Sequence, residues 1–114
     1  MRITSDLWVA AVVRRVFAAG GFAAVLKRGA LEAGAIFVVT RNRLGEATLY
    51  GPAPQASYDS GKPQDRRFQL LIRESADAIE ARLAKEERFD PDLWVVELET
   101  GDRDAGEFIL TEQA

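Results

Sequence analysis

The sequence contains no cysteine and no histidine among its 114 residues. These absences exclude a disulfide framework, a thiolate zinc site and a nucleophilic triad or dyad that depends on His or Cys. A metal site would have to use oxygen ligands alone, which favours Mg²⁺ or Ca²⁺. The chemistry open to this chain is therefore that of carboxylates, amines, guanidinium groups, hydroxyls and aromatic rings.

Long apolar runs are also missing. The run 16–26 is much shorter than the roughly 20 residues that cross a bilayer. Arg14 and Arg15 precede it, as in a twin-arginine export signal, but Lys27 follows it without a small-residue cleavage site. We therefore expect a cytoplasmic protein that does not associate with a membrane.

The composition is typical of a globular protein, with 47% hydrophobic and 29% charged residues. A chain of this length buries one modest core, so we expect a single domain over residues 1–114. The net charge is −3, although basic side chains outnumber acidic ones in residues 1–57. That asymmetry leaves a nucleic-acid surface open, but the overall pI near 5.0 disfavours it.

Two helices are predicted. The first begins at Ser5 as its N-cap, buries a valine stripe and ends at the Gly20-Gly21 pair. The second spans Ala76–Arg88 behind the N-cap Ser75 and has a narrow apolar stripe, typical of a surface helix.

Six segments have strand character, the last of them the weakest. Ala35–Asn42 is apolar on both faces and should be central, whereas Leu93–Glu99 alternates like a half-exposed strand. In chain order the strands are Phe22–Lys27, Ala35–Asn42, Glu46–Tyr50, Phe68–Arg73, Leu93–Glu99 and Glu107–Leu110. The order α-β-β-β-β-α-β-(β), with short early links, predicts a two-layer α+β domain. Its sheet would be mostly antiparallel, with four to six strands and two helices.

The irregular stretch Gly51–Asp65 carries three of the four prolines and has the length of a binding loop. Tyr50 and Tyr58 lie at its base and within it, and Arg66 and Arg67 follow it. Guanidinium groups bind phosphate or carboxylate, and tyrosine rings stack on planar ligands. We take these four residues as candidate binding residues. The alternative is that Arg66 pairs with a nearby aspartate and the rings pack the loop onto the sheet.

No catalytic or metal-binding residue can be assigned. The glycine-rich phosphate loops and the Gly-x-Ser-x-Gly nucleophile turn are absent from the sequence. The carboxylate pair Asp90 and Asp92 is explained by turn chemistry, and the pair Glu97 and Glu99 by the polar side of a strand. We expect no cofactor.

Several segments together resemble a known family. They are LWVAAVVRRV (7–16), GGFAAVLKRG (20–29), LYGPAPQASYD (49–59), DRRF (65–68) and RFDPDLWVVELE (88–99). The chain is similar over nearly its whole length to domain-of-unknown-function family 1491, a set of small, mostly alphaproteobacterial proteins. The resemblance implies a stand-alone bacterial domain, and it transfers no activity or site residue.

Three functions remain open. The leading hypothesis is a non-enzymatic interaction or regulatory domain that binds a protein partner or associates with itself as a homodimer. The first alternative is a nucleic-acid-binding module that uses an arginine-rich face. The second is a small-ligand-binding protein, or an enzyme that works through Asp and Glu.

Overall fold

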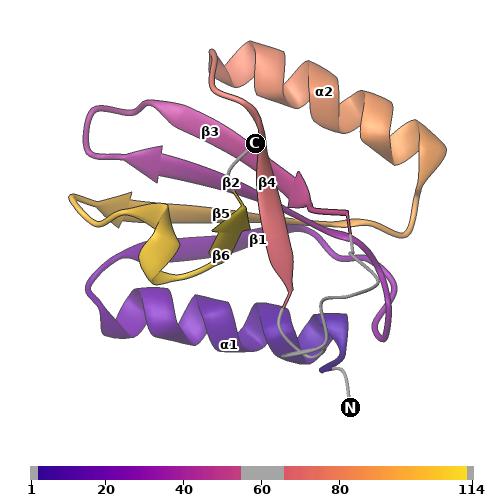
Figure 1. The fold of residues 1–114 in the computed structure, drawn as a ribbon, viewed down its shortest axis with the longest axis horizontal. Coiled ribbons are helices and arrows are strands. Elements are labelled where there is room, and N and C mark those ends of the chain that lie inside the picture. Colours follow the sequence, from indigo (N-terminus) through magenta and orange to yellow (C-terminus); the bar gives the residue numbers. More distant parts are fainter. Residues whose placement is uncertain (1–2, 55–65, 113–114) are drawn as a thin grey trace.

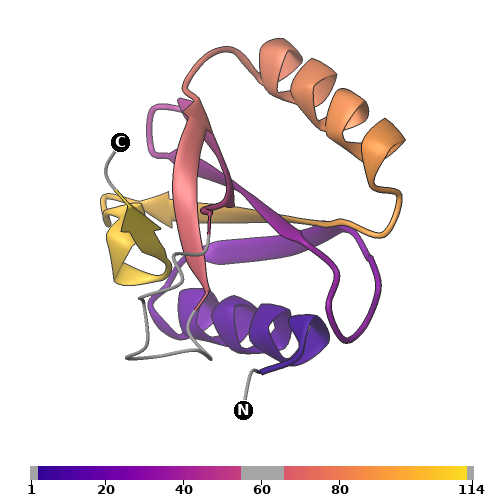
Figure 2. The ribbon, with the colours of Figure 1, turned by 45° about the vertical axis from the view of Figure 1, so that its right-hand side comes forward.

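The computed structural model describes residues 3–54 and 66–112. Within these ranges a six-stranded sheet lies between two helices (Figures 1 and 2). The elements are α1 (Ser5–Ala18), β1 (Phe22–Lys27), β2 (Ile36–Asn42), β3 (Ala47–Pro52), β4 (Arg67–Ile72), α2 (Ala76–Phe89), β5 (Trp94–Gly101), the 3₁₀-helix η1 (Ala105–Glu107) and β6 (Leu110–Glu112). The α+β class, the two helices and the predicted order of elements are confirmed.

The sheet is mixed, so the prediction of a mostly antiparallel sheet was wrong. The strand order is β1-β5-β2-β3-β4-β6, with parallel pairing of β2 with β5 and of β4 with β6. The short link between β1 and β2 suggested neighbours, but β5 lies between them. Its residues Trp94, Val95 and Val96 are at most 5% exposed, so this strand is buried on both faces and needs an interior position.

The helices lie on opposite faces of the sheet, which makes three layers rather than the predicted two (Figure 1). Alternate residues of the central strands therefore pack in opposite directions. Ile36 and Val38 join the core beneath α1, and Phe37 and Val39 join the core beneath α2. The chain from η1 to β6 covers the α1 side as well, because Phe108 and Ile109 belong to that core.

The first helix begins differently from the prediction. Thr4 occupies the N-cap position, and its side chain makes no capping hydrogen bond. Ser5 is fully buried, and its hydroxyl donates to the backbone carbonyl of Gly34 at 2.7 Å. Ser5 therefore fixes the helix start to the β1–β2 connection. The helix ends as expected, since Gly20 has a φ of +88°, a conformation that favours glycine.

We expect Ser5→Ala to lower the free energy of unfolding by about 1–3 kcal/mol. The substitution leaves the Gly34 carbonyl without its buried donor, and burying such a group unpaired carries that penalty. Chemical denaturation measures the effect. The matched control is Ser75→Ala, which removes the exposed hydroxyl that caps α2 by accepting from the Ala78 amide; its expected cost is about 1 kcal/mol. A smaller cost for Ser5→Ala than for Ser75→Ala would contradict the role given to Ser5.

The predictions for the β2–β3 turn and the cap of α2 are confirmed, whereas those for the last two strands are not. The β2–β3 hairpin is antiparallel, and Gly45 in its turn has a φ of +83°. The predicted N-cap Ser75 is confirmed. By contrast, β5 is not half-exposed over its first residues, and the last strand is Leu110–Glu112 rather than Glu107–Leu110. Among the described residues, no helix has the length and apolar character needed to cross a membrane.

Candidate binding groove

A groove of about 240 Å³ lies where α1 meets the C-terminal segment and the start of β4. Its apolar lining comes from a tryptophan, a phenylalanine and smaller aliphatic side chains, and two guanidinium groups complete it. The lining residues are Ile3, Trp8, Ala11, Arg15, Arg66, Phe108 and Leu110. Among the described residues, the lining contains two cationic side chains and no acidic one.

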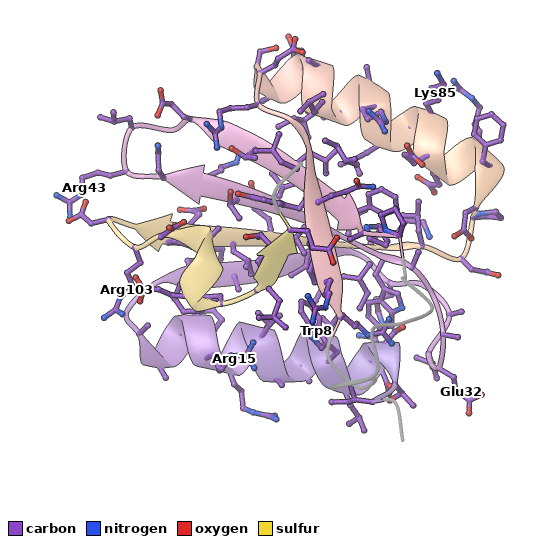
Figure 3. All side chains as sticks on the ribbon, viewed as in Figure 1. Trp8, Arg15, Glu32, Arg43, Lys85 and Arg103 are labelled. Carbon is purple, nitrogen blue, oxygen red and sulfur yellow. The ribbon has the colours of Figure 1, made fainter. Side chains whose placement is uncertain are left out.

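Helix α1 supplies one wall through the spacing of its residues. Trp8, Ala11 and Arg15 are three and four residues apart, so they form a stripe beside the buried valines. In Figure 3, Trp8 and Arg15 lie along the side of α1 that faces β4 and β6. The Trp8 ring packs on Phe68 at a centroid distance of 5.2 Å, which fixes its position in the groove. Because the side chain of Ala11 is small, the space between the side chains of Trp8 and Arg15 stays open.

Both guanidinium groups also hold the walls of the groove in place. Arg15 Nη2 donates to the carbonyl of Phe108 at 2.8 Å, which links α1 to the segment before β6. Arg66 Nη2 donates to the carbonyl of Ile3 at 3.0 Å, which links the start of β4 to the chain before α1. The groove is therefore built by contacts between residues that are 93 and 63 positions apart in the sequence.

The three predicted binding residues that the structure describes do not meet at one place. Arg66 lines the groove, whereas Tyr50 is 9% exposed and belongs to the α1-side core. Arg67 is on the opposite side of the strand from Phe68 and pairs with Glu112 at 3.7 Å. Tyr58 lies outside the described residues. Only one of the four predicted residues thus contributes to the groove as described.

Sequence reasoning missed most of the groove. Trp8 and Arg15 were not among the predicted binding residues. A signal for the α1 wall was present, because Trp8 and Arg15 flank the valine stripe on the same side at a spacing of seven residues. No comparable signal existed for Phe108 or Leu110, since only the fold brings them to α1.

The paired carboxylates behave as the turn and strand explanations predicted. The Asp90 side chain accepts from the Asp92 amide at 3.1 Å, which is a local turn contact. Glu97 forms an ion pair with Arg41 on the α2 side of the sheet. In the ranges 3–54 and 66–112, no three acidic side chains gather as a metal-binding group would.

The fold and the groove define a small three-layer α+β protein with a candidate binding groove among its described residues. Its sequence matches, over residues 3–109, a family described as proteins of unknown function (DUF1491). The chain belongs to this DUF1491 family, as its sequence motifs indicated.

Solved structures support the assignment. The chain is similar to protein Atu0922 from A. tumefaciens, known from a solution structure, with 50% identity and a TM-score of 0.83 over 100% of this chain and 98% of that one. A DUF1491 family protein from Caulobacter crescentus CB15 is 33% identical. Its crystal structure gives a TM-score of 0.77 over 96% of this chain and 99% of that one. An NMR structure of a DUF1491 family protein from the same organism, also 33% identical, gives a TM-score of 0.79 over 99% of both chains. None of the curated proteins matches this chain.

Proposed function

We propose that this chain is a non-enzymatic interaction domain that binds a short segment of a partner protein in the α1 groove. The segment would insert a large apolar side chain beside Trp8 and place a carboxylate near the Arg15 guanidinium. The observation that carries the proposal is the described lining of the groove, in which apolar side chains surround the Arg15 guanidinium. Arginine forms charge-assisted hydrogen bonds with carboxylates, and aromatic residues with arginine commonly anchor protein interfaces.

The size of the groove favours a protein segment over a small molecule. Pockets for drug-sized ligands and cofactors usually enclose about 300–1,000 Å³. This groove has about 240 Å³, which is room for one or two side chains. A peptide needs no more than that at an anchor position, because the rest of its chain lies on the surrounding surface.

The ion pairs of other arginines favour a protein segment over a nucleic acid. Arg43 pairs with Asp102 at 2.8 Å, and Arg41 pairs with Glu97. A nucleic-acid surface depends on a continuous field from many basic side chains, and these acids reduce that field. The groove instead combines a local positive charge with apolar contact area.

Selection from a random-peptide display library tests this proposal on the intact protein. We expect enriched peptides to share a large apolar residue next to Asp or Glu. Two groove variants should each weaken their binding by about tenfold or more, the scale of one charge-assisted hydrogen bond. Arg15→Gln removes the charge, and Ala11→Glu adds a carboxylate four residues before Arg15, where it competes with the peptide for that guanidinium.

Arg14 provides the matched control for this selection. It is the neighbouring arginine of α1, is exposed and does not line the groove. Arg14→Gln changes the net charge as Arg15→Gln does, so it should leave peptide binding within about twofold of wild type if only the groove matters. Absence of any enriched motif, or equal losses for the Arg14 and Arg15 variants, would refute the proposal.

A further inference from the structure

Strand β1 is an open edge of the sheet. Its six residues pair with β5 on one side, and among the described strands none pairs with its other side. An open edge presents unpaired N–H and C=O groups, and natural proteins usually protect it with charges, proline or short length. The only charged residue of β1 is Lys27, at its end. The Lys27 amino group donates to the carbonyls of Pro91 and Leu93, which holds it against the neighbouring loop rather than across the edge.

Apolar side chains are exposed along this edge. Phe17, Phe22, Val25 and Leu26 are 49%, 50%, 37% and 56% exposed, respectively. The rings of Phe17 and Phe22 meet edge to face at 5.6 Å, so the end of α1 extends the surface of the strand. Half-exposed aromatic rings leave about 100 Å² each uncovered, and the four side chains together about 300 Å². That is a substantial part of the roughly 800 Å² per partner that a standard interface buries.

We propose that β1 pairs antiparallel with β1 of a second copy of this chain, so that two sheets join into one. The other edge of the sheet is a poor partner for β1. Strand β6 has three residues, and its Glu112 is paired with Arg67. A pairing of β1 with β6 would make few backbone hydrogen bonds. It would also let copies add one after another without a closed assembly, whereas pairing of β1 with β1 gives a closed dimer about a two-fold axis.

The charges at the two ends of β1 fit this arrangement. The two-fold axis of such a pair is perpendicular to the sheet and passes between two copies of the same residue. With the axis at Ala24, the Phe22 end of one strand meets the Leu26–Lys27 end of the other. Glu99 neighbours Phe22 on β5, so it stands two strand spacings, about 10 Å, from the end of the other copy's strand that carries Lys27. Each end of the joined strands therefore brings a carboxylate towards an ammonium group, and the symmetry repeats the attraction.

The pairing uses β1, at the other end of the strand order from β4 and β6, and none of the residues that line the groove belongs to the new contact. Two grooves related by a two-fold axis could hold two segments of one partner or of a partner dimer. Linked sites of this kind gain affinity from effective concentration. Self-association through β1 does not depend on the groove proposal, and each can fail without the other.

The mass in solution tests the proposal on the full chain. We expect sedimentation to give twice the 12.6 kDa of the chain at micromolar concentration. Phe22→Lys should weaken the dimer by at least tenfold, since it replaces an apolar ring in the contact and brings a second ammonium group to the end of the other strand that carries Lys27. Phe22→Glu removes the same ring but attracts Lys27, so its dimer should be several-fold tighter than that of Phe22→Lys. Leu44→Lys, at an 82% exposed turn position, is the control that should not change the mass.

The circular dichroism spectrum and melting temperature of each variant establish that it folds. Hydrogen exchange of wild type then locates the contact, because backbone amides of β1 should exchange more slowly in wild type than in folded Phe22→Lys. A monomer at all concentrations would overturn the proposal, even if it captured an extended peptide along β1. A dimer that Phe22→Lys leaves intact, or that both Phe22 variants weaken equally, would overturn it as well.

Discussion

Trp94→Ala is expected to lower the free energy of unfolding by about 3–5 kcal/mol, the range for removing a buried aromatic side chain. Trp94 is 1% exposed at the centre of the α1-side core. Its Nε1 donates to the Ala30 carbonyl at 2.7 Å, and the Arg28 guanidinium lies 5.2 Å from its ring centroid. One side chain thus joins the core to the β1–β2 connection. A domain of this size has about 5–15 kcal/mol of total stability, so the variant should be close to unfolding at 37 °C.

Urea denaturation followed by circular dichroism measures this loss. The matched control is Phe89→Ala, because Phe89 is also aromatic but is 81% exposed at the end of α2. Its substitution should change stability by no more than about 0.5 kcal/mol. A loss below about 1 kcal/mol for Trp94→Ala would contradict the placement of this ring in the core.

Gly29→Ala is expected to have the second largest effect, a loss of about 3 kcal/mol or a failure to fold. A Cβ atom at Gly29 would stand 2.1 Å from the Asp92 carbonyl oxygen and 2.5 Å from that of Leu93. These atoms belong to the backbone that leads into β5, so they cannot turn away as a side chain would. Relief requires the β1–β2 connection to move off β5, which also breaks the Ala30–Asp92 hydrogen bond of 2.9 Å.

A second glycine provides the control for Gly29. At Gly106, in η1, the nearest atom to an added Cβ is 3.9 Å away and φ is not positive. Gly106→Ala should therefore be neutral or slightly stabilising, because alanine restricts the unfolded chain. Thermal unfolding of the two variants side by side measures the difference. Similar melting temperatures for the two variants would contradict the close approach of Gly29 to the carbonyls of Asp92 and Leu93.

Much of the secondary structure could be predicted because local patterns determine it. The β-branched run of β2, the turn at Gly45 and the cap at Ser75 each act within a few residues. Strand order is different, because it depends on which strands are buried on both faces. The continuous apolar run from Leu93 to Val96 carried that signal for β5, but the alternation of Trp94, Val96 and Leu98 led to the opposite interpretation.

The candidate site could be predicted only in part for a related reason. Arg66 was identified because it follows a proline-rich stretch, a local feature. Phe108 and Leu110 reach the groove because the chain crosses the α1 side of the sheet between β5 and β6. No spacing in the sequence encodes that crossing. Tyr50 was proposed for its chemistry, but its position between β2 and β4 places it in the core.

The central claim is that the α1 groove is the binding surface of this protein. Nuclear magnetic resonance of the ¹⁵N-labelled chain, titrated with an enriched acidic peptide from the display selection, tests it most directly. We predict that the largest shift changes fall on the Trp8 indole, the Ala11 amide and the amides of Phe108 and Leu110, and that Ala11→Glu abolishes them while Arg14→Gln does not. Shift changes centred on α2 or on the β2–β3 turn, with the Trp8 indole unmoved, would contradict the account.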